Sequence, residues 1–453
     1  MSVHDEDRKR NRYRFDRHTP EYREQFETIT QEMHQKCPVA WSDTYDGHWV
    51  AAGAQEVFEI ARASEHLSNE HDVDGSLGHG YKGITIPAPN PAPPVCGGFL
   101  EMDPPKQRHY RQTLNPYLSP AAVNRWIPVI DEVVRASLDE RIETGRIDFV
   151  DDLANVVPAV ITLGMLGISV DKWRLYSEPT HASVYTPPES PEMAEVRRQQ
   201  RELYGDVATQ IAAIRESPRP GLIDALVRAE IDGGTPDDLE LLGVLALLIG
   251  GGFDTTTALT AHALEWLSDN PAERERLSRD RDTLLNSATE EFLRFFTPAP
   301  GDGRTVKQDC EIAGTSFQEG ERVWLSWAMA TRDPAIFSDP NRVDLERKGN
   351  RHLGFGLGIH RCIGSNLART VFKRMAVQVL DRMPDYRCDP DGTVHYQTIG
   401  VIQGMQKLPA TFTPGPRLGP GLDETLRSVQ RVIDEQRLAE PVTRQRSAAD
   451  IAR

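Results

Sequence analysis

The residue with the most distinctive chemistry is Cys362, which lies in the segment FGLGIHRCIG over residues 355–364. Three glycines in ten residues let a backbone turn tightly and let another group approach it closely. The cysteine precedes a predicted helix, SNLARTVFKRMAVQVL, whose positive N-terminal end and unpaired N–H groups favour a thiolate. The residues alone leave three alternatives open: a metal-ligating thiolate, a catalytic nucleophile or a buried thiol without chemistry.

A second reactive segment, GGFDTT, occupies residues 251–256 at the end of an apolar run. Adjacent glycines cost a helix about 1 kcal/mol each, so they need a reason. Asp254 and Thr255 place an acid beside an alcohol, and such a pair can move protons through water. The alternative is a helix that ends at the glycines, with Thr255 and Thr256 as capping residues.

Two further segments carry charged residues at regular spacing. In EEFLR, Glu291 and Arg294 are three residues apart and therefore share one helix face. In DPPKQRHYR, over residues 103–111, Gln107 and Arg111 are four residues apart. Either pattern by itself is typical of an ordinary solvated helix.

Together these segments resemble the cytochromes P450. FGLGIHRCIG matches F-G-x-G-x-H-x-C-x-G at every fixed position, and GGFDTT, EEFLR and DPPKQRHYR match further family segments in the family's order. The resemblance implies that Cys362 binds the iron of haem b as a thiolate. It further implies contacts to the haem from Gln107, Arg111, Gly251, Arg304, His352, Phe355, His360 and Gly364, with Gln107, Arg111, Arg304 and His352 reaching the propionates.

The resemblance also assigns roles to residues that do not bind the cofactor. Asp254 and Thr255 are expected to relay protons during oxygen reduction, with Thr256 as the neighbouring candidate. Glu291, Arg294 and Arg347 are expected to form a buried cluster that fixes the cysteine loop.

The implied fold is mainly α with small peripheral β-sheets, and the haem lies between the helix of residues 251–256 and the helix after Cys362. Apolar residues recur at three- and four-residue spacing through most of residues 105–293, which predicts helices. Residues 46–63 are expected to form a short strand followed by a helix. Further short strands are expected after Arg304 and near Phe412. Prolines and glycines in TPAPGDGR predict an irregular strand after EEFLR.

Three regions are expected along the chain. Residues 1–35 form a polar leader, residues 36–413 the haem-thiolate monooxygenase domain, and residues 414–453 a linker with an amphipathic tail. The tail places apolar residues on one helical face, either to dock on the domain or to bind a partner; they are Leu422, Leu426, Val429 and Ile433.

Composition restricts the possible partners. Lys and Arg total 52 against 68 Asp and Glu, a net charge of -16 that argues against nucleic acid. The N-terminus is polar and the apolar run over 241–253 is too short for a bilayer, so we expect a cytoplasmic protein without a membrane span. The five cysteines include no C-x-x-C pair, which argues against a zinc or dithiol site.

The expected activity is insertion of one atom of O2 into a hydrophobic small molecule, with a weak similarity to terpene-hydroxylating members. Because 40 residues after the haem region cannot form a flavin domain, electrons are expected from an external ferredoxin and its reductase. A cationic dock for the ferredoxin on the proximal face is predicted from Lys106, Arg108, Arg111, Arg361, Arg369, Lys373 and Arg374.

Two alternatives remain. A peroxide-using or isomerising haem-thiolate enzyme would typically lack the acid–alcohol pair, which is present here as Asp254 and Thr255. A haem-based sensor or carrier would need a sixth protein ligand, and residues 250–257 contain no His, Met or Cys.

Overall fold

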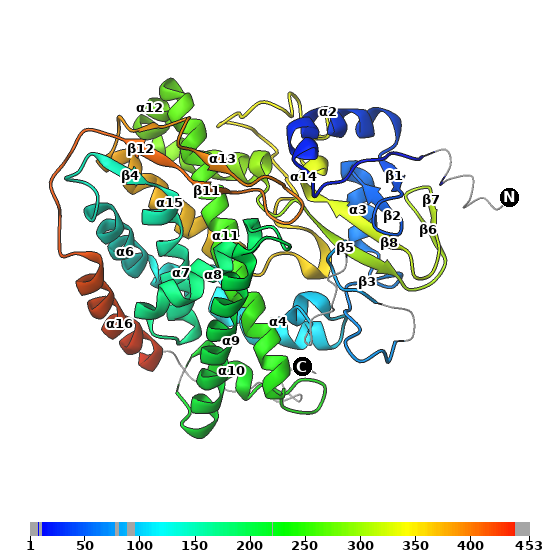
Figure 1. Cartoon of the computed structure of the whole chain (residues 1–453), viewed down its shortest axis with the longest axis horizontal. Helices are drawn as coiled ribbons and strands as arrows, with labels where there is room; N and C mark the ends of the chain where they lie inside the picture. The colour runs from blue at the N-terminus through cyan, green and yellow to red at the C-terminus, as the bar shows by residue number, and fades with distance from the viewer. Residues whose placement is uncertain (1–7, 9–10, 78–80, 88–95, 220, 440–453) are drawn as a thin grey trace.

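The fold consists of a large helical part and a smaller part built on one five-stranded sheet (Figure 1). The computed structural model describes residue 8 and residues 11–77, 81–87, 96–219 and 221–439. The α-helices are α2 Pro20–Lys36, α3 Ala54–Arg62, α4 Lys106–Leu118, α5 Pro120–Arg125, α6 Ile127–Asp139, α7 Val156–Leu166, α8 Trp173–Tyr185, α9 Glu192–Glu216, α10 Leu222–Val227, α11 Asp238–Asp269, α12 Pro271–Arg279, α13 Arg281–Phe296, α14 Trp327–Ala330, α15 Ser365–Arg382 and α16 Leu422–Ala439. The predicted mainly helical fold is confirmed.

The main sheet has the strand order β1-β2-β8-β5-β3. Strands β2 and β8 pair in parallel and the other neighbours pair antiparallel. Smaller sheets join β10 with β11, β4 with β12 and β9, and β6 with β7. The bounds are β1 Val39–Ser42, β2 His48–Ala51, β3 Leu67–Ser68, β4 Arg146–Asp148, β5 Gly301–Val306, β6 Cys310–Ile312, β7 Thr315–Phe317, β8 Arg322–Ser326, β9 Arg387–Cys388, β10 Val394–His395, β11 Met405–Lys407 and β12 Pro409–Thr411.

The prediction of an irregular strand after EEFLR is wrong. Strand β5 pairs in continuous register with β8 from Gly301 to Thr305. A Cβ at Gly301 would lie 2.4 Å from the carbonyl oxygen of Leu325, and one at Gly303 would lie 2.7 Å from that of Ile84. These glycines therefore permit close packing of neighbouring backbones.

Helix α11 runs through the centre of the helical part and contacts α7 and α15. Its N-cap is Asp237, whose carboxylate accepts a hydrogen bond from the N–H of Glu240. The helix continues without a break through Gly250, Gly251 and Gly252, so the alternative of a helix end at these glycines is wrong. Among the described helices, α11 alone has the length and composition to cross a membrane, and 56% of its most apolar window is buried in this fold.

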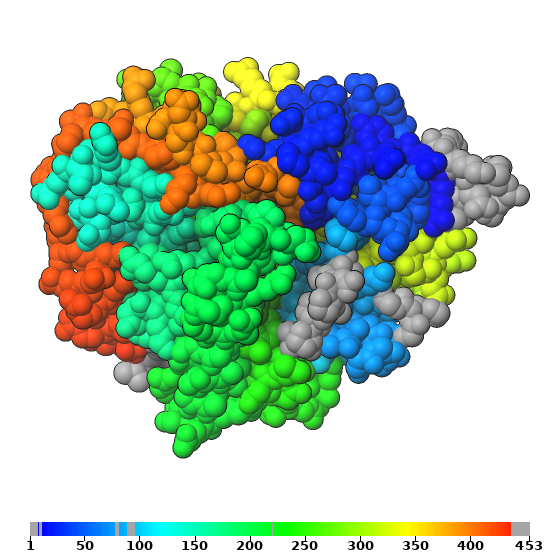
Figure 2. All heavy atoms as spheres, viewed as in Figure 1, coloured from blue at the N-terminus to red at the C-terminus, as the bar shows by residue number. Residues whose placement is uncertain are grey.

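Both ends of the described chain pack on the domain. Although residues 1–35 were expected to be a polar leader, α2 buries Tyr22, Ile29 and Met33 in a core cluster with the sheet. At the other end, α16 packs against α6 and lies on the outside of the molecule (Figures 1 and 2). Its predicted apolar face is buried in the main core; these residues are Leu422, Leu426, Val429 and Ile433. Of the two alternatives for the tail, docking on the domain is therefore the one that α16 shows.

Candidate active site

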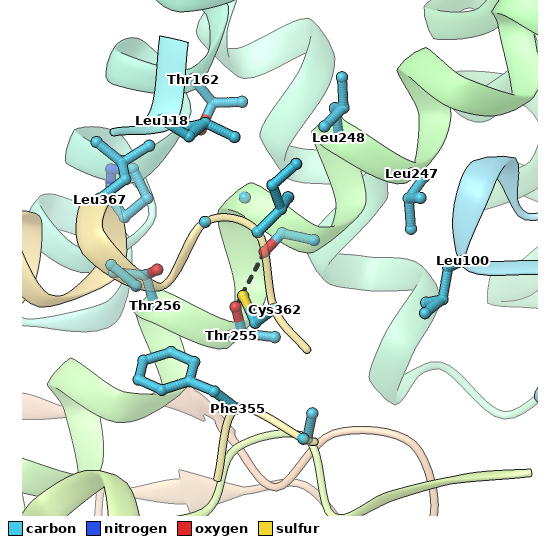
Figure 3. A pocket seen from close by; sticks show the side chains of 18 of the residues that line it. Leu100, Leu118, Thr162, Leu247, Leu248, Thr255, Thr256, Phe355, Cys362 and Leu367 are labelled. Atoms are coloured by element: carbon cyan, nitrogen blue, oxygen red, sulfur yellow. Dashed lines mark hydrogen bonds between the residues drawn. The ribbon is translucent and has the colours of Figure 1, made fainter. Parts of the chain in front are cut away.

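A cavity separates α11 from the cysteine loop (Figure 3). One wall is formed by α11 with Gly251, Gly252, Thr255 and Thr256. The opposite wall is the loop and the start of α15, and its lining residues are Phe355, Gly356, His360, Cys362, Ile363, Gly364, Leu367, Ala368 and Val371. The structure thus brings the two predicted reactive segments to opposite sides of one space.

The cysteine loop is held by its own backbone. The N–H of Cys362 donates to the carbonyl of Phe355 over 2.8 Å, and Gly356 and Gly358 adopt positive φ angles of 65° and 76°. Helix α15 begins three residues after the cysteine, as expected. The turn directs the Sγ atom into the cavity rather than into packed side chains.

The structure changes the prediction for the ionisation of Cys362. Burial raises the pKa of the thiol, and this effect exceeds the lowering caused by the Gly364 backbone and by Arg361, Arg111 and Arg369. The lowering by the helix N-terminus and the nearby cations therefore only partly offsets the effect of burial. Binding of a cation by the sulfur would favour the thiolate at neutral pH.

The wall formed by α11, called the distal wall below, contains one glycine with free space beside it and one that is closely packed. A Cβ at Gly251 would meet nothing within 4 Å, whereas a Cβ at Gly252 would lie 2.7 Å from Oγ1 of Thr162 on α7. Gly251 thus leaves room in the cavity, and Gly252 allows α7 to approach. The Thr255 hydroxyl donates to the Gly251 carbonyl over 3.1 Å and faces the cavity.

Asp254 points away from the cavity although it precedes Thr255. Its carboxylate is 3% exposed and lies 2.5 Å from Nδ1 of His181, on α8. Tyr396 directly follows β10, and its hydroxyl lies 3.1 Å from both carboxylate oxygens of Asp254. His181 and Tyr396 carry no motif signal in the sequence, and the proton-relay prediction did not include them.

Three basic side chains, none with a carboxylate partner among the described residues, lie at or near the cavity. Arg111 and His360 line the cavity, and Arg304 is buried within electrostatic range of His360. Neither arginine forms an ion pair with a described carboxylate. Burial, Arg304 and Arg111 lower the pKa of His360 to about 2, and its Nδ1 atom is buried without a described partner.

These features fit haem. The largely apolar lining suits a porphyrin, Arg111 at the cavity and Arg304 beside it could pair with propionates, and Cys362 would bind the iron through its sulfur. When bound, thiolate-ligated haem supplies activation of O2 and cleavage of the O–O bond.

Two residues predicted to contact the propionates have protein partners in this structure. His352 does not line the cavity; its Nε2 atom lies 3.2 Å from Glu290, and its Nδ1 accepts the Gly354 N–H. Gln107 is 2% exposed and donates to the Ile359 carbonyl over 2.7 Å, which ties α4 to the cysteine loop. His360, in the motif itself, takes the position beside Arg111 and Arg304 because the loop turns its ring inward.

The predicted charged cluster behind the cysteine loop has a fully buried centre, Glu291 with Arg294, and a partly buried third member, Arg347. Arg294 and Glu291 are both 0% exposed and form two hydrogen bonds of 2.8 Å. Arg347 donates to the same carboxylate over 2.9 Å, and the N–H of Asp344 donates to it over 2.8 Å. Arg294 also donates to three backbone carbonyls, so the cluster joins α13 to the segment that leads into the cysteine loop.

The site has the geometry of a haem-thiolate protein. The Cytochrome P450 family model matches residues 185–384. A steroid C26-monooxygenase of Mycobacterium tuberculosis is 31% identical over 336 residues, which cover 73% of this chain and 89% of that protein. The linalool 8-monooxygenase of Pseudomonas putida is 29% identical over 376 residues, covering 78% and 88% of the two chains.

Solved structures agree. Mycobacterium marinum cytochrome P450 CYP268A2 in complex with pseudoionone superposes with a TM-score of 0.78 at 27% identity, covering 86% of this chain and 95% of that one. CYP109E1 from Bacillus megaterium in complex with testosterone gives 0.74 at 26% identity, covering 87% and 99%. The chain belongs to the cytochrome P450 family. It is a haem-dependent monooxygenase whose cofactor is thiolate-ligated haem b.

Proposed function

We propose that this chain hydroxylates a hydrophobic small molecule of terpene or steroid size in the cytoplasm. The observation that carries the proposal is the apolar lining of the cavity on the side away from the cysteine loop. It includes Phe99, Leu100, Leu247, Leu248 and Leu222. Related proteins named for linalool, steroid and vitamin D3 substrates support the same size range.

The polar residues at the cavity fit a role in proton delivery. Thr255 offers its hydroxyl on the distal wall, where it can hold a water molecule next to the reacting oxygen. Asp254 acts from behind this wall, where His181 and Tyr396 orient its carboxylate. Protons would pass from this buried group to Thr255 through water, since the two side chains leave the helix in different directions.

We also propose that electrons come from an acidic ferredoxin with its own reductase. Hydrogen bonding between Gln107 and Ile359 places the first turn of α4 beside the cysteine loop. Of the predicted cations there, Lys106, Arg369 and Arg374 are paired with Glu240, Glu290 and Asp131, and Arg111 faces the cavity. Arg108, Arg361 and Lys373 form no ion pair with a described acid, so they are the residues best suited to attract a partner.

The test combines binding and turnover. A panel of terpenes, steroids and fatty acids is titrated into the ferric protein, and displacement of water from the haem is followed in the Soret region. Each binding compound is then incubated under 18O2 with NADH, a ferredoxin and its reductase. We expect a singly oxygenated product that carries one labelled atom and requires the ferredoxin.

Two controls identify the alternatives. Cys362→Ala removes the axial sulfur and should abolish turnover. Formation of the same product with hydrogen peroxide alone, at an undiminished rate and without ferredoxin, would contradict the proposal and favour a peroxide-using enzyme.

A further inference from the structure

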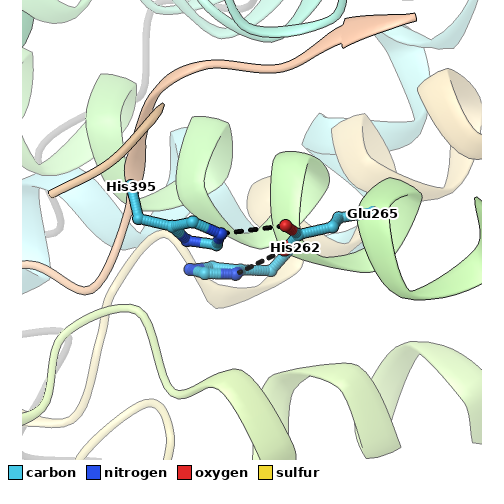
Figure 4. Close-up of side chains that lie close together, drawn as sticks. All are labelled: His262, Glu265 and His395. Carbon is cyan, nitrogen blue, oxygen red and sulfur yellow. Dashed lines mark hydrogen bonds and ion pairs between the residues drawn. The ribbon is translucent and has the colours of Figure 1, made fainter. Parts of the chain in front are cut away.

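Outside the haem cavity, two histidines and a glutamate meet where β10 crosses the last third of α11 (Figure 4). His262 and Glu265 are three residues apart on α11 and share a face, and His395 is the last residue of β10. One ligand atom from each residue lies within 4.8 Å of the others. Both rings direct a nitrogen toward the Glu265 carboxylate.

The distances are suited to a small cation. His395 Nε2 is 2.9 Å from one Glu265 oxygen, and His262 Nδ1 is 3.8 Å from the other. A tetrahedral zinc ion with bonds of about 2.0–2.1 Å separates its ligand atoms by about 3.3 Å, between these two values. Modest rotation of the side chains would therefore complete the coordination.

His262 is the most buried of the three residues. The residue is 5% exposed and its ring stacks on Phe296 at 5.0 Å. Its Nδ1 is too far from Glu265 for a hydrogen bond, and its Nε2 is buried without a described partner. Nδ1, the nitrogen that faces Glu265, therefore forms no hydrogen bond with a described residue and could take an ion as its partner.

We propose that His262, Glu265 and His395 bind a divalent zinc ion, with water in the remaining position. Two imidazoles, one carboxylate and an open site are a donor set typical of zinc. The side chains of Glu265 and His395 are about one-quarter exposed, at 25% and 26%, which gives the ion and its water access from solvent. This site lies apart from Cys362 and does not depend on the proposed substrate or electron donor.

The ion would also have a structural effect. His395 is followed directly by Tyr396, whose hydroxyl contacts Asp254 two to three turns earlier on α11. Zinc at residue 395 would fasten β10 to α11 next to this contact. Because the ion binds the folded protein, we expect zinc to raise the thermal midpoint of the haem-loaded enzyme.

The experiment is equilibrium dialysis of the haem-loaded full-length protein against Zn2+, with bound zinc and iron measured by mass spectrometry. We expect one zinc per haem. Glu265→Gln and His395→Asn should each weaken binding at least about tenfold, since even hydrogen-bond partners of metal ligands change affinity by about 10- to 100-fold. The zinc-dependent rise in thermal midpoint should disappear in both variants.

Two matched variants control for other binding groups. His66→Gln removes a histidine next to an acid, Glu65, on another surface. Cys388→Ser removes a thiol close to Glu265. Burial, with a smaller contribution from the Glu265 charge, raises the pKa of this thiol to about 12. Both variants should bind zinc as the parent does. Unchanged zinc binding in Glu265→Gln and His395→Asn, or no saturable binding by the parent, would overturn the proposal.

Discussion

At the scale of single residues, the site separates two neighbours that the motif places together. Thr255 faces the cavity, whereas Asp254 is buried between His181 and Tyr396. Successive helical residues point about 100° apart, and this turn places the Thr255 side chain toward the cavity and the Asp254 side chain toward α8. The alcohol therefore contacts the reaction chamber, and the acid is oriented by residues from α8 and from the chain after β10.

The first prediction concerns Thr255→Ala. Haem content and substrate affinity should be unchanged, because the hydroxyl donates only to the Gly251 carbonyl among the described residues. Product formed per NADH should fall at least about tenfold, since a positioned proton donor typically contributes about 100- to 10,000-fold. The missing electrons should appear as hydrogen peroxide, measured with a peroxidase assay.

Thr255→Ser is the matched control for this variant, because it keeps the hydroxyl and should retain most of the coupling. If Thr255→Ala makes as much product per NADH as the parent, the role passes to Thr256, which also lines the cavity.

At the scale of elements, α13 secures the cysteine loop through two consecutive glutamates. Glu291, itself fully buried, binds the fully buried Arg294 and the partly buried Arg347. Glu290 points to the other side, where it accepts from Arg369 of α15 and contacts His352. Arg369 in turn lies 4.4 Å above the ring of Phe355, the first residue of the loop motif. The helix thus supports both the segment before the loop and the helix after it.

The second prediction compares Glu291→Gln with Glu290→Gln. Glu291→Gln should destabilise the protein by about 3–5 kcal/mol, because it leaves the buried Arg294 without its counter-charge. Glu290→Gln should cost clearly less, since the Glu290 side chain is 31% exposed and water can replace part of the interaction. Denaturant unfolding followed by haem absorbance and by circular dichroism measures both. Equal losses would contradict the assignment of Glu291 as the main support.

The pH dependence of the Glu290 contribution has a definite sign. Burial by itself would raise the pKa of Glu290, but hydrogen bonds from Arg369 and His352 outweigh burial and lower it to about 2. The stabilisation is therefore present above the ordinary pKa of a glutamate and is lost as pH falls from about 4.5 toward 2. The stability difference between the parent and Glu290→Gln should shrink over that range.

At the scale of the whole molecule, the net charge of -16 makes a local cationic surface significant. Arg108 lies on α4, Arg361 in the cysteine loop and Lys373 on α15, and the Gln107–Ile359 hydrogen bond joins α4 to that loop. Arg369 was also predicted to belong to this surface. It is a less suitable residue to mutate, because its guanidinium forms an ion pair with Glu290.

The third prediction is that Arg108→Glu combined with Lys373→Glu slows reduction by ferredoxin and leaves substrate affinity unchanged. Reduction of the parent should also slow steeply with salt, since the Debye length falls from about 10 Å at 0.1 M to about 3 Å at 1 M. Stopped-flow reduction measures both. Arg146→Glu, an exposed cation on β4, is the charge-matched control and should behave as the parent. A rate insensitive to salt and to the double variant would rule out this dock.

The sequence by itself determined the class of the protein and the residue that the family motif assigns as the haem ligand. Cys362 and its glycines lie in one continuous segment, and such a loop folds from local turns and a helix start. Likewise, the cluster of Glu291 with Arg294 follows from three-residue spacing on one helix. Local patterns of this kind survive in any fold that contains the segment.

Only the tertiary structure decided which groups meet across long sequence distances. His181, Asp254 and Tyr396 come from three distant segments of the chain. The contact of His352 with Glu290, and the position of His360 beside Arg111 and Arg304, also join segments that are far apart in the sequence. The grouping of His262 and Glu265 with His395 likewise needs β10 to cross α11. A side chain's partner and burial depend on the packing of whole elements, and no spacing within one segment contains that information.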